Sequence, residues 1–185
     1  MRNGVWILAL AALAACEPAA SPAAPVAADA DVSQRTYGMN LKLTEGGVLK
    51  ADLFGDTAFQ RPGNADVTEL RNVRLTFHEA QGKKPGTLTS KTGDYDMRTG
   101  IMVARGNVVL VTYNEKGEKR TIRTEELHYD QRGDRVWSER ETFVEEEAQT
   151  FVSQGFTSDT RFTNIQGRNA KSTGVRVNET DVVGP

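Results

Sequence analysis

The stretch LTSKTGDYDMRTGIMVARGNVVL, residues 88–110, decides the fold. It predicts two strands joined by a tight turn at 96–100, with the second strand continuing to Tyr113. In the turn, the Asp96 side chain can accept hydrogen bonds from nearby backbone, and Gly100 can adopt a positive φ. In the second strand, period 2 places an uncharged set on one face: Met102, Ala104, Gly106, Val108 and Leu110.

The same unit recurs along the chain. When IRTEELHYDQRGD, residues 122–134, is aligned with the first stretch, Tyr129–Asp130 coincides with Tyr95–Asp96. Looser copies end in Asp56 and Asp159, so the four aspartates follow one another at intervals of about 30 to 40 residues. Such a spacing, about two strands with their turns, predicts a coiled or rolled β architecture.

The N-terminus predicts an export signal. Arg2 precedes a short apolar run, Val5–Leu13, and LAAC at 13–16 is a small-residue cleavage site ending in cysteine. The apolar run is about half the roughly 20 residues that a membrane-spanning helix needs. LAAC resembles the bacterial lipobox, in which the cysteine is acylated, and Cys16 is the only cysteine. We expect residues 1–15 to be a lipoprotein signal peptide and Cys16 to be lipidated; the alternative is ordinary secretion.

The rest of the chain divides by composition. Residues 16–35 are Ala/Pro-rich without apolar periodicity and predict a flexible tether. Residues 36–170 predict one domain with a sizeable core, and 171–185 a polar tail that is partly disordered or forms a final weak strand. With 23 basic and 25 acidic residues and no basic run, the chain lacks the electrostatic basis for binding nucleic acid.

Outside the central stretch, short regular strands with Gly/Asp turns predict an all-β sandwich, roll or barrel. In the strand 70–78, Val73, Leu75 and Phe77 alternate onto one face. Further on, Leu127 and Tyr129 rejoin the face of Ile122 and Thr124 only if Glu125–Glu126 form a bulge. Residues 139–149 are compatible with a helix or a solvated loop.

The sequence offers few catalytic candidates. The histidines are His78 and His128, and neither has Cys/His neighbours at metal-ligand spacing. No nucleophile elbow, zincin helix or phosphate-binding loop occurs. The repeated aspartates could be read as the acid pair of an envelope hydrolase or as a calcium site, but their place at the start of turns favours a capping role. We therefore expect a binding or scaffolding protein without enzymatic activity, metal or cofactor.

Five motifs, in order, resemble the LptC family, the periplasmic components of the lipopolysaccharide export machine related to LptA/OstA-type domains. They are GVLKADLFGDTAF (47–59), LRNVRLTF (70–77), LTSKTGDYDMRTG (88–100), ARGNVVL (104–110) and TEELHYD (124–130). The resemblance spans roughly residues 47–164. It implies an open, twisted β-jellyroll, the OstA-like roll, with an apolar interior and two unclosed ends. Well-known members keep an N-terminal transmembrane helix, whereas this sequence has a signal and a lipobox.

The resemblance implies a role in lipopolysaccharide transport. The roll would receive acyl chains from an inner-membrane ABC transporter and pass them to an LptA-like periplasmic bridge protein. Edge strands would join the neighbouring rolls by β-augmentation, with residues 37–53 facing the transporter and 151–165 facing the bridge protein. The protein would then be periplasmic and lipid-anchored, with the inner membrane implied by the family.

The apolar face is the expected lipid-binding surface. We expect this inward lining: Val73, Leu75, Phe77, Met102, Ala104, Val108, Leu110, Ile122 and Phe143. The alternative is that these side chains fill a dry core, as in an envelope structural or glycan-binding lipoprotein built on the same roll.

Overall fold

The computed structural model describes residues 32, 34–78, 86–114, 116–147 and 149–175. The chain divides into two compact units, Met1–Ala30 and Asp31–Pro185, and all described residues belong to the second. The predicted signal peptide, Cys16 and most of the predicted tether therefore lie outside the described residues. The same holds for residues 176–185 of the predicted tail.

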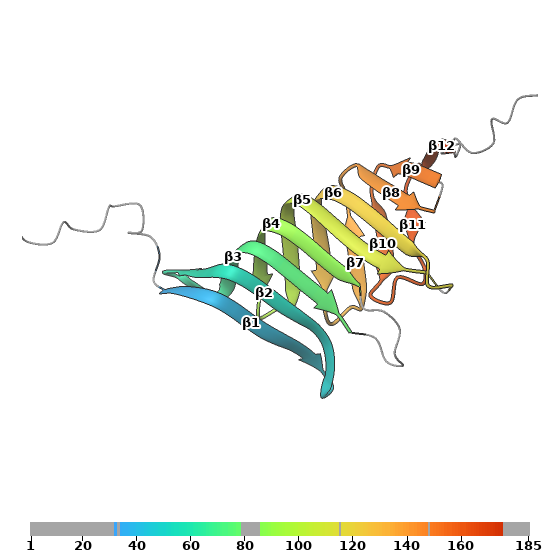
Figure 1. Ribbon diagram of the computed structural model, residues 1–185. Coiled ribbons are helices and arrows are strands. Elements are labelled where there is room, and N and C mark those ends of the chain that lie inside the picture. Colours follow the sequence, from blue (N-terminus) through green and yellow to red (C-terminus); the bar gives the residue numbers. More distant parts are fainter. Residues whose placement is uncertain (1–31, 33, 79–85, 115, 148, 176–185) are drawn as a thin grey trace, which may run out of the picture. The chain divides into compact units, whose positions relative to one another are not determined.

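The second unit is built from strands. In chain order they are β1 (Gln34–Glu45), β2 (Val48–Arg61), β3 (Asn64–Phe77), β4 (Thr87–Asp96), β5 (Ile101–Tyr113), β6 (Lys119–Asp130), β7 (Arg135–Ser138), β8 (Thr142–Glu146), β9 (Gln149–Ser153), β10 (Phe156–Asp159), β11 (Gln166–Gly167) and β12 (Lys171–Val175). They form one antiparallel sheet, whose first six strands pair in sequence order (Figure 1).

The sheet divides at β6. Residues 120–124 of this strand pair with β8, whereas His128–Asp130 pair with β7. From β8 the sheet continues through β9 to β12. From β7 it continues through β10 to β11. The sheet therefore starts at a single edge, β1, and ends at two edges, β11 and β12.

The long strands change their buried face near the middle. In β3, Leu70 and Val73 are both buried although strict alternation would place them on opposite faces, and Asn72 between them has φ 48°. The pattern slips in the same way in β2, β4 and β6. In β5, Gly106 and Asn107 have φ of 76° and 50°, where the register shifts. Such irregularities bend a strand.

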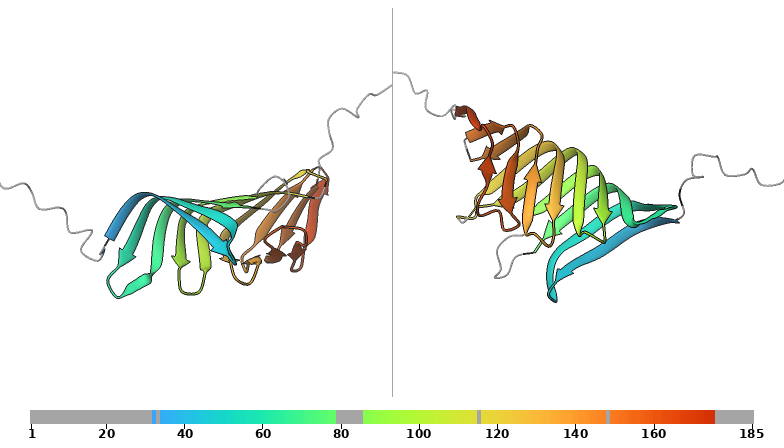
Figure 2. Two further views of the ribbon diagram at one scale, coloured as in Figure 1. Left: turned by 90° about the horizontal axis from the view of Figure 1, so that it is seen from below. Right: turned by 180° about the vertical axis from the view of Figure 1, so that it is seen from behind.

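These irregularities are neighbours across the sheet and form a continuous fold line, defined by its exposed residues Asp56, Asn72, Lys91, Asn107 and Glu125. Along it the sheet folds over into two layers. Layer 1 is the half that carries Leu70, Tyr95, Ala104 and Tyr129, and layer 2 is the half that carries Leu53, Leu75, Leu88 and Leu110. Figure 2 shows the folded sheet from two further directions.

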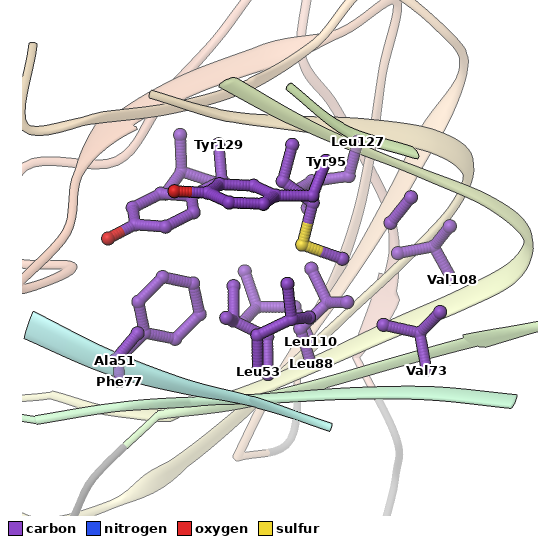
Figure 3. Packing of buried hydrophobic residues seen from close by; sticks show 14 of the residues in the cluster. Ala51, Leu53, Val73, Phe77, Leu88, Tyr95, Val108, Leu110, Leu127 and Tyr129 are labelled. Carbon is purple, nitrogen blue, oxygen red and sulfur yellow. The ribbon is translucent and has the colours of Figure 1, made fainter. Parts of the chain in front are cut away.

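The core lies between the two layers. In Figure 3, Tyr95, Leu127 and Tyr129 face Phe77, Leu53 and Leu88 across the interior. Leu127 and Tyr129 are buried on the same side as Ile122 and Thr124, so the change of face expected at Glu125–Glu126 is confirmed. The extra residue of the bulge lies in β5 and not in β6, because Gly106 and Asn107 together lie opposite Glu125. The predicted all-β, open, twisted roll is confirmed as well.

Two local predictions are wrong. The described part of residues 139–149 is neither a helix nor only a solvated loop, because β8, Thr142–Glu146, lies in its middle and pairs on both sides, and Gln149 begins β9. Asp56 does not begin a turn. It lies inside β2 on the fold line, where its Oδ2 accepts a 2.8 Å hydrogen bond from Nδ2 of Asn72.

Candidate functional site

The interior between the layers is the candidate site. Eight of the nine residues predicted to line it belong to one buried cluster: Val73, Leu75, Phe77, Met102, Ala104, Val108, Leu110 and Ile122. Each side chain is at most 2% exposed, because both faces of the interior are covered by the folded sheet. Their contact with a lipid remains a prediction, since in this structure they pack against one another.

Phe143 is the exception, and its predicted inward position is wrong. Its side chain is 42% exposed, on the outside of layer 2. Thr142 is fully buried and Val144 packs against the core, and alternation along β8 then turns Phe143 outward. Hydrophobicity favours Phe143 over Thr142 for the interior, but the register in which β8 pairs with β6 places Thr142 there.

Several interior residues were absent from the predicted lining. They are Leu43, Ala51, Leu53, Ala58, Leu70, Leu88, Tyr95, Leu127, Tyr129, Val136, Phe156 and Phe162. The alternation of Ala51 with Leu53, and the pairing of Leu88 with Leu110, were signals that could have found part of this set. Phe162 has no such signal, because it lies outside any strand.

Opposite the fold line the two layers approach each other along a seam, defined here by Thr44, Phe77 and Gly86 of layer 2 and Gln131 and Phe162 of layer 1. Nε2 of Gln131 donates a 2.8 Å hydrogen bond to the carbonyl of Thr44. Oε1 of the same amide accepts a 3.2 Å hydrogen bond from the hydroxyl of Tyr95. One side chain thus joins the ends of both layers.

Phe162 closes the seam at a second place. Its ring packs edge-on against Phe77, with centroids 5.1 Å apart, and Phe77 packs edge-on against Tyr129 at 5.3 Å. Phe162 is 3% exposed although it lies in the loop after β10. It fits because Gly86 has no side chain: a Cβ there would lie 2.8 Å from Cε2 of Phe162.

The backbone of Phe162 is held in an uncommon conformation. Its φ is 56°, in the left-handed region that bulky residues rarely adopt. The main-chain N–H of Phe162 donates to the carbonyl of Asp159 at 3.2 Å, and N–H of Thr163 donates to Oδ1 of Asp159 at 3.0 Å. Asp159 therefore caps the turn that presents Phe162 to the interior, which confirms a capping role for this copy of the repeat.

The interior reaches both ends of the roll. At the β1 end, Met39 and Leu41 pack against the core and line a cavity of about 220 Å³. At the other end, Val144 and Ile165 pack against the core and line a second cavity of about 220 Å³. Ser153 also lines this second cavity, and its buried Oγ has no hydrogen-bond partner among the described residues.

The edges of the sheet differ from those predicted at the C-terminal end. Residues 151–165 do not form an edge, because β9 pairs with both β8 and β12, and β10 pairs with both β7 and β11. The edge strands are β11 and β12, and β12 lies within the predicted tail. At the other end β1 is the edge, so the predicted segment 37–53 lies on an edge only as far as Glu45, because β2 pairs with both β1 and β3.

The repeated aspartates have structural partners. Oδ1 of Asp96 accepts hydrogen bonds from N–H of Arg98 and Thr99, at 2.8 and 3.1 Å. Oδ1 of Asp130 accepts from N–H of Arg132 and Gly133, at 3.0 and 2.9 Å. The bond from Thr99 is the largest of the effects that hold the pKa of Asp96 below its usual value. The capping role expected for these two residues is confirmed.

The outer face of layer 1 carries a paired polar network. The guanidinium of Arg105 donates to Asp94 at 2.5 Å and to Glu126 at 2.9 Å. The His128 ring stacks on Trp137 at 4.9 Å, with Nε2 3.2 Å from Glu126, so His128 faces outward as predicted. Within the described ranges there is no group of three or more metal-ligating side chains and no helix long and apolar enough to cross a bilayer.

The chain is similar to a solved structure and matches a model of a known family. A similar solved structure is LptH, described as the LptA homologous periplasmic component of the conserved lipopolysaccharide transport device from Pseudomonas aeruginosa. It is 17% identical, covers 73% of this chain and 88% of its own, and has a TM-score of 0.48. No curated protein sequence matches. A model of the family described as lipopolysaccharide-assembly, LptC-related, matches residues 5–166, so the chain belongs to the LptC-related family.

Proposed function

We propose that this protein is a non-enzymatic component of lipopolysaccharide transport that holds acyl chains between its two layers. The observation that carries the proposal is the apolar interior, which continues from Met39 and Leu41 at one end to Val144 and Ile165 at the other, in a member of a lipopolysaccharide-assembly family. Such an interior offers an extended apolar path between two sheet edges.

The energetics make a shielded path necessary. An acyl chain that leaves a bilayer loses about 0.8 kcal/mol per CH₂ group, so one long chain costs on the order of 10 kcal/mol in water. Side chains such as Leu75, Leu110 and Ile122 present an apolar surface that replaces the bilayer. An acyl chain can occupy this space only if the two layers move apart, because the same side chains now pack against one another.

The edges suggest how partners would attach. The β1 edge is proposed to pair with the inner-membrane ABC transporter, and the β11 and β12 edges with an LptA-like bridge protein, each by β-augmentation. This arrangement would use edge strands that are otherwise prone to aggregation. The ATPase of the transporter would supply the energy for transport.

The N-terminal sequence supports a proposed anchor. Acylation of Cys16 after cleavage of residues 1–15 would hold the roll at the periplasmic face of a membrane, with the inner membrane implied by the family. Residues 16–35 would act as the tether between the anchor and β1.

A second candidate is an envelope structural or glycan-binding lipoprotein with a permanently filled core. It is favoured by the packing of Phe77, Tyr129 and Phe162 across the interior. Glycan binding is less favoured, because the ring of Trp137 is stacked on His128 and also lies 4.8 Å from the guanidinium carbon of Arg135. This leaves little aromatic surface for a sugar.

Photo-crosslinking separates the two functions. A crosslinking amino acid is placed at Leu75 or Leu110, with the outward neighbours Thr76 and Val109 as matched controls. During active export, we expect lipopolysaccharide adducts at the inward positions and few at the outward ones. Correctly folded variants that yield no adduct at any inward position would favour the filled-core lipoprotein.

A further inference from the structure

We propose that the surface formed by Phe77, Gly86 and Tyr129 is a binding site for a single acyl chain, and that Phe162 occupies this site in the free protein. The inference rests on the proposed function, because it names the place along the seam where a chain is received. Phe162 would then be an intramolecular competitor for lipid.

The site has two aromatic side chains on one side and a glycine, with no side chain, on another. Phe77 and Tyr129 pack edge-on at 5.3 Å and form the aromatic side, with Phe77 from layer 2 and Tyr129 from layer 1. Gly86 forms the other side, and its missing side chain leaves the room that the Phe162 ring now takes. The main-chain carbonyl of Gly86 accepts a 2.9 Å hydrogen bond from N–H of Phe77. Any residue at position 86 could accept this bond, so the bond itself does not require glycine.

Phe162 reaches this site from outside the sheet. It belongs to neither β10 nor β11, so its ring can leave the interior without breaking a strand ladder. The left-handed φ of 56° is unfavourable for a phenylalanine and is held by the turn that Asp159 caps. Release of the ring would let this turn relax, which offsets part of the lost packing.

The chemistry of the site fits a saturated hydrocarbon chain. The site is formed by two aromatic rings and a glycine. The only polar side-chain atom of these three residues is the Tyr129 hydroxyl, and burial raises its pKa so that it stays neutral. A flexible apolar chain can replace an apolar ring here without burying a charge. The polar headgroup would remain outside the seam.

Two variants test the proposal by different routes. F162A removes the competing ring. The double variant F162A/G86A also adds a methyl group in the space that Gly86 leaves, so it should obstruct the acyl chain; Gly86 does not have a positive φ that alanine would resist. F143A is the matched control, because it removes the same kind of side chain from the outside of layer 2, where Phe143 is 42% exposed.

Binding is measured by titrating the full chain carrying C16S with a fluorescent fatty acid, followed by displacement with purified lipopolysaccharide. The C16S change removes the protein's own acyl group, which would otherwise compete. We expect F162A to bind the probe roughly tenfold or more tightly than the parent chain, because the binding-competent fraction rises, and F162A/G86A to lose much of this gain. F143A should bind like the parent.

The outcomes distinguish this inference from the proposed function. If the parent chain binds but folded F162A binds no more tightly than F143A, the competitor role of Phe162 is wrong and the transport function stands. If no folded variant binds the probe or lipopolysaccharide, the proposed function fails, and this inference with it. Tighter binding by F143A as well, or equal binding by F162A and F162A/G86A, would show that the gain does not arise beside Gly86 and would also overturn the inference.

Discussion

The side-chain amide of Gln131 donates a 2.8 Å hydrogen bond to the main-chain carbonyl of Thr44, 87 residues earlier in the chain. This contact joins the turn after β6 to the end of β1, at the open side of the folded sheet. Elsewhere the strands are joined by ladders of main-chain hydrogen bonds. The seam is joined by side chains instead, so it can separate while the ladders stay intact.

Removal of the Gln131 side chain should weaken the seam with little effect on the rest of the fold. We expect Q131A to lower the free energy of unfolding by about 1–3 kcal/mol, because it removes two hydrogen bonds, to Thr44 and from Tyr95, each with a usual net value of about 0.5–1.5 kcal/mol. Urea denaturation measures this, and hydrogen exchange should accelerate near Thr44. The control Q166A removes an exposed amide bonded only to Asn164 at 3.2 Å among the described contacts, and should change stability by no more than about 0.5 kcal/mol. Equal losses would mean that the Thr44 contact is not stabilising.

Truncation inside the roll should cost far more than truncation outside it. L110A removes a fully buried side chain and should destabilise the protein by about 2–5 kcal/mol. V109A, on the opposite face of the same strand, should cost no more than about 1 kcal/mol. Thermal and urea unfolding of the two variants measure the difference. Similar losses for both would contradict the assignment of the buried face in β5.

The fold line should resist side chains at Gly106. Its φ of 76° is unfavourable for any residue with a Cβ, and an added Cβ would lie 3.3 Å from Cβ of Lys91. We expect G106A to destabilise the protein by about 1–2 kcal/mol through backbone conformation. The double variant K91A/G106A tests the crowding by the long side chain, because it removes Cδ of Lys91, which would also lie 3.3 Å from the added Cβ, but keeps Cβ of Lys91 and the φ. Full recovery of stability in the double variant would show that crowding, not φ, is decisive.

Loss of the turn cap at Asp96 should appear as a change in acid stability. Its folded-state pKa lies below the usual value, so its stabilising effect is present above the unfolded pKa, near pH 4, and is lost as the pH falls through the folded pKa. D96A should therefore lower the melting temperature at neutral pH, and the difference from the parent should shrink in strong acid. A constant difference across this range would exclude the charged carboxylate as the cause.

The same aspartates provide a test against catalysis. D96N and D130N are expected to change stability alone, because each Oδ1 is already occupied by two backbone N–H groups of its turn. Lipopolysaccharide crosslinking at Leu110 should persist in both variants. An envelope-hydrolase activity that the parent protein has and that D96N or D130N lacks would contradict a purely structural role for these aspartates.

Acylation of Cys16 is tested by fractionation. The parent protein should sediment with membranes, whereas C16S should be recovered in the soluble periplasmic fraction, because the loss of all acyl chains removes the anchor. Metabolic labelling with a tagged fatty acid gives an independent readout. Membrane association of C16S equal to that of the parent, without labelling of either, would favour ordinary secretion or a different anchor.

Features governed by neighbouring residues were predictable. The Tyr-Asp turns follow from aspartates that accept hydrogen bonds two and three residues ahead, as at Asp96 and Asp130. Within each half-strand, period 2 identified the buried face, as for Val73, Leu75 and Phe77. The predicted inward position of Phe143 was wrong because alternation only says which residues share a face. Which of the two faces of β8 is buried depends on its register with β6.

The sequence by itself determined the all-β class, the turn positions and the apolar face of each half-strand, since these depend on backbone geometry over a few residues. Only the tertiary structure decided where the sheet folds over, which residues close the seam and how Phe162 becomes buried. The left-handed φ of Asn72 and the contact of Gln131 with Thr44 depend on strands brought together across the sheet. No local period encodes such contacts, because their energy exists only once the two layers face each other.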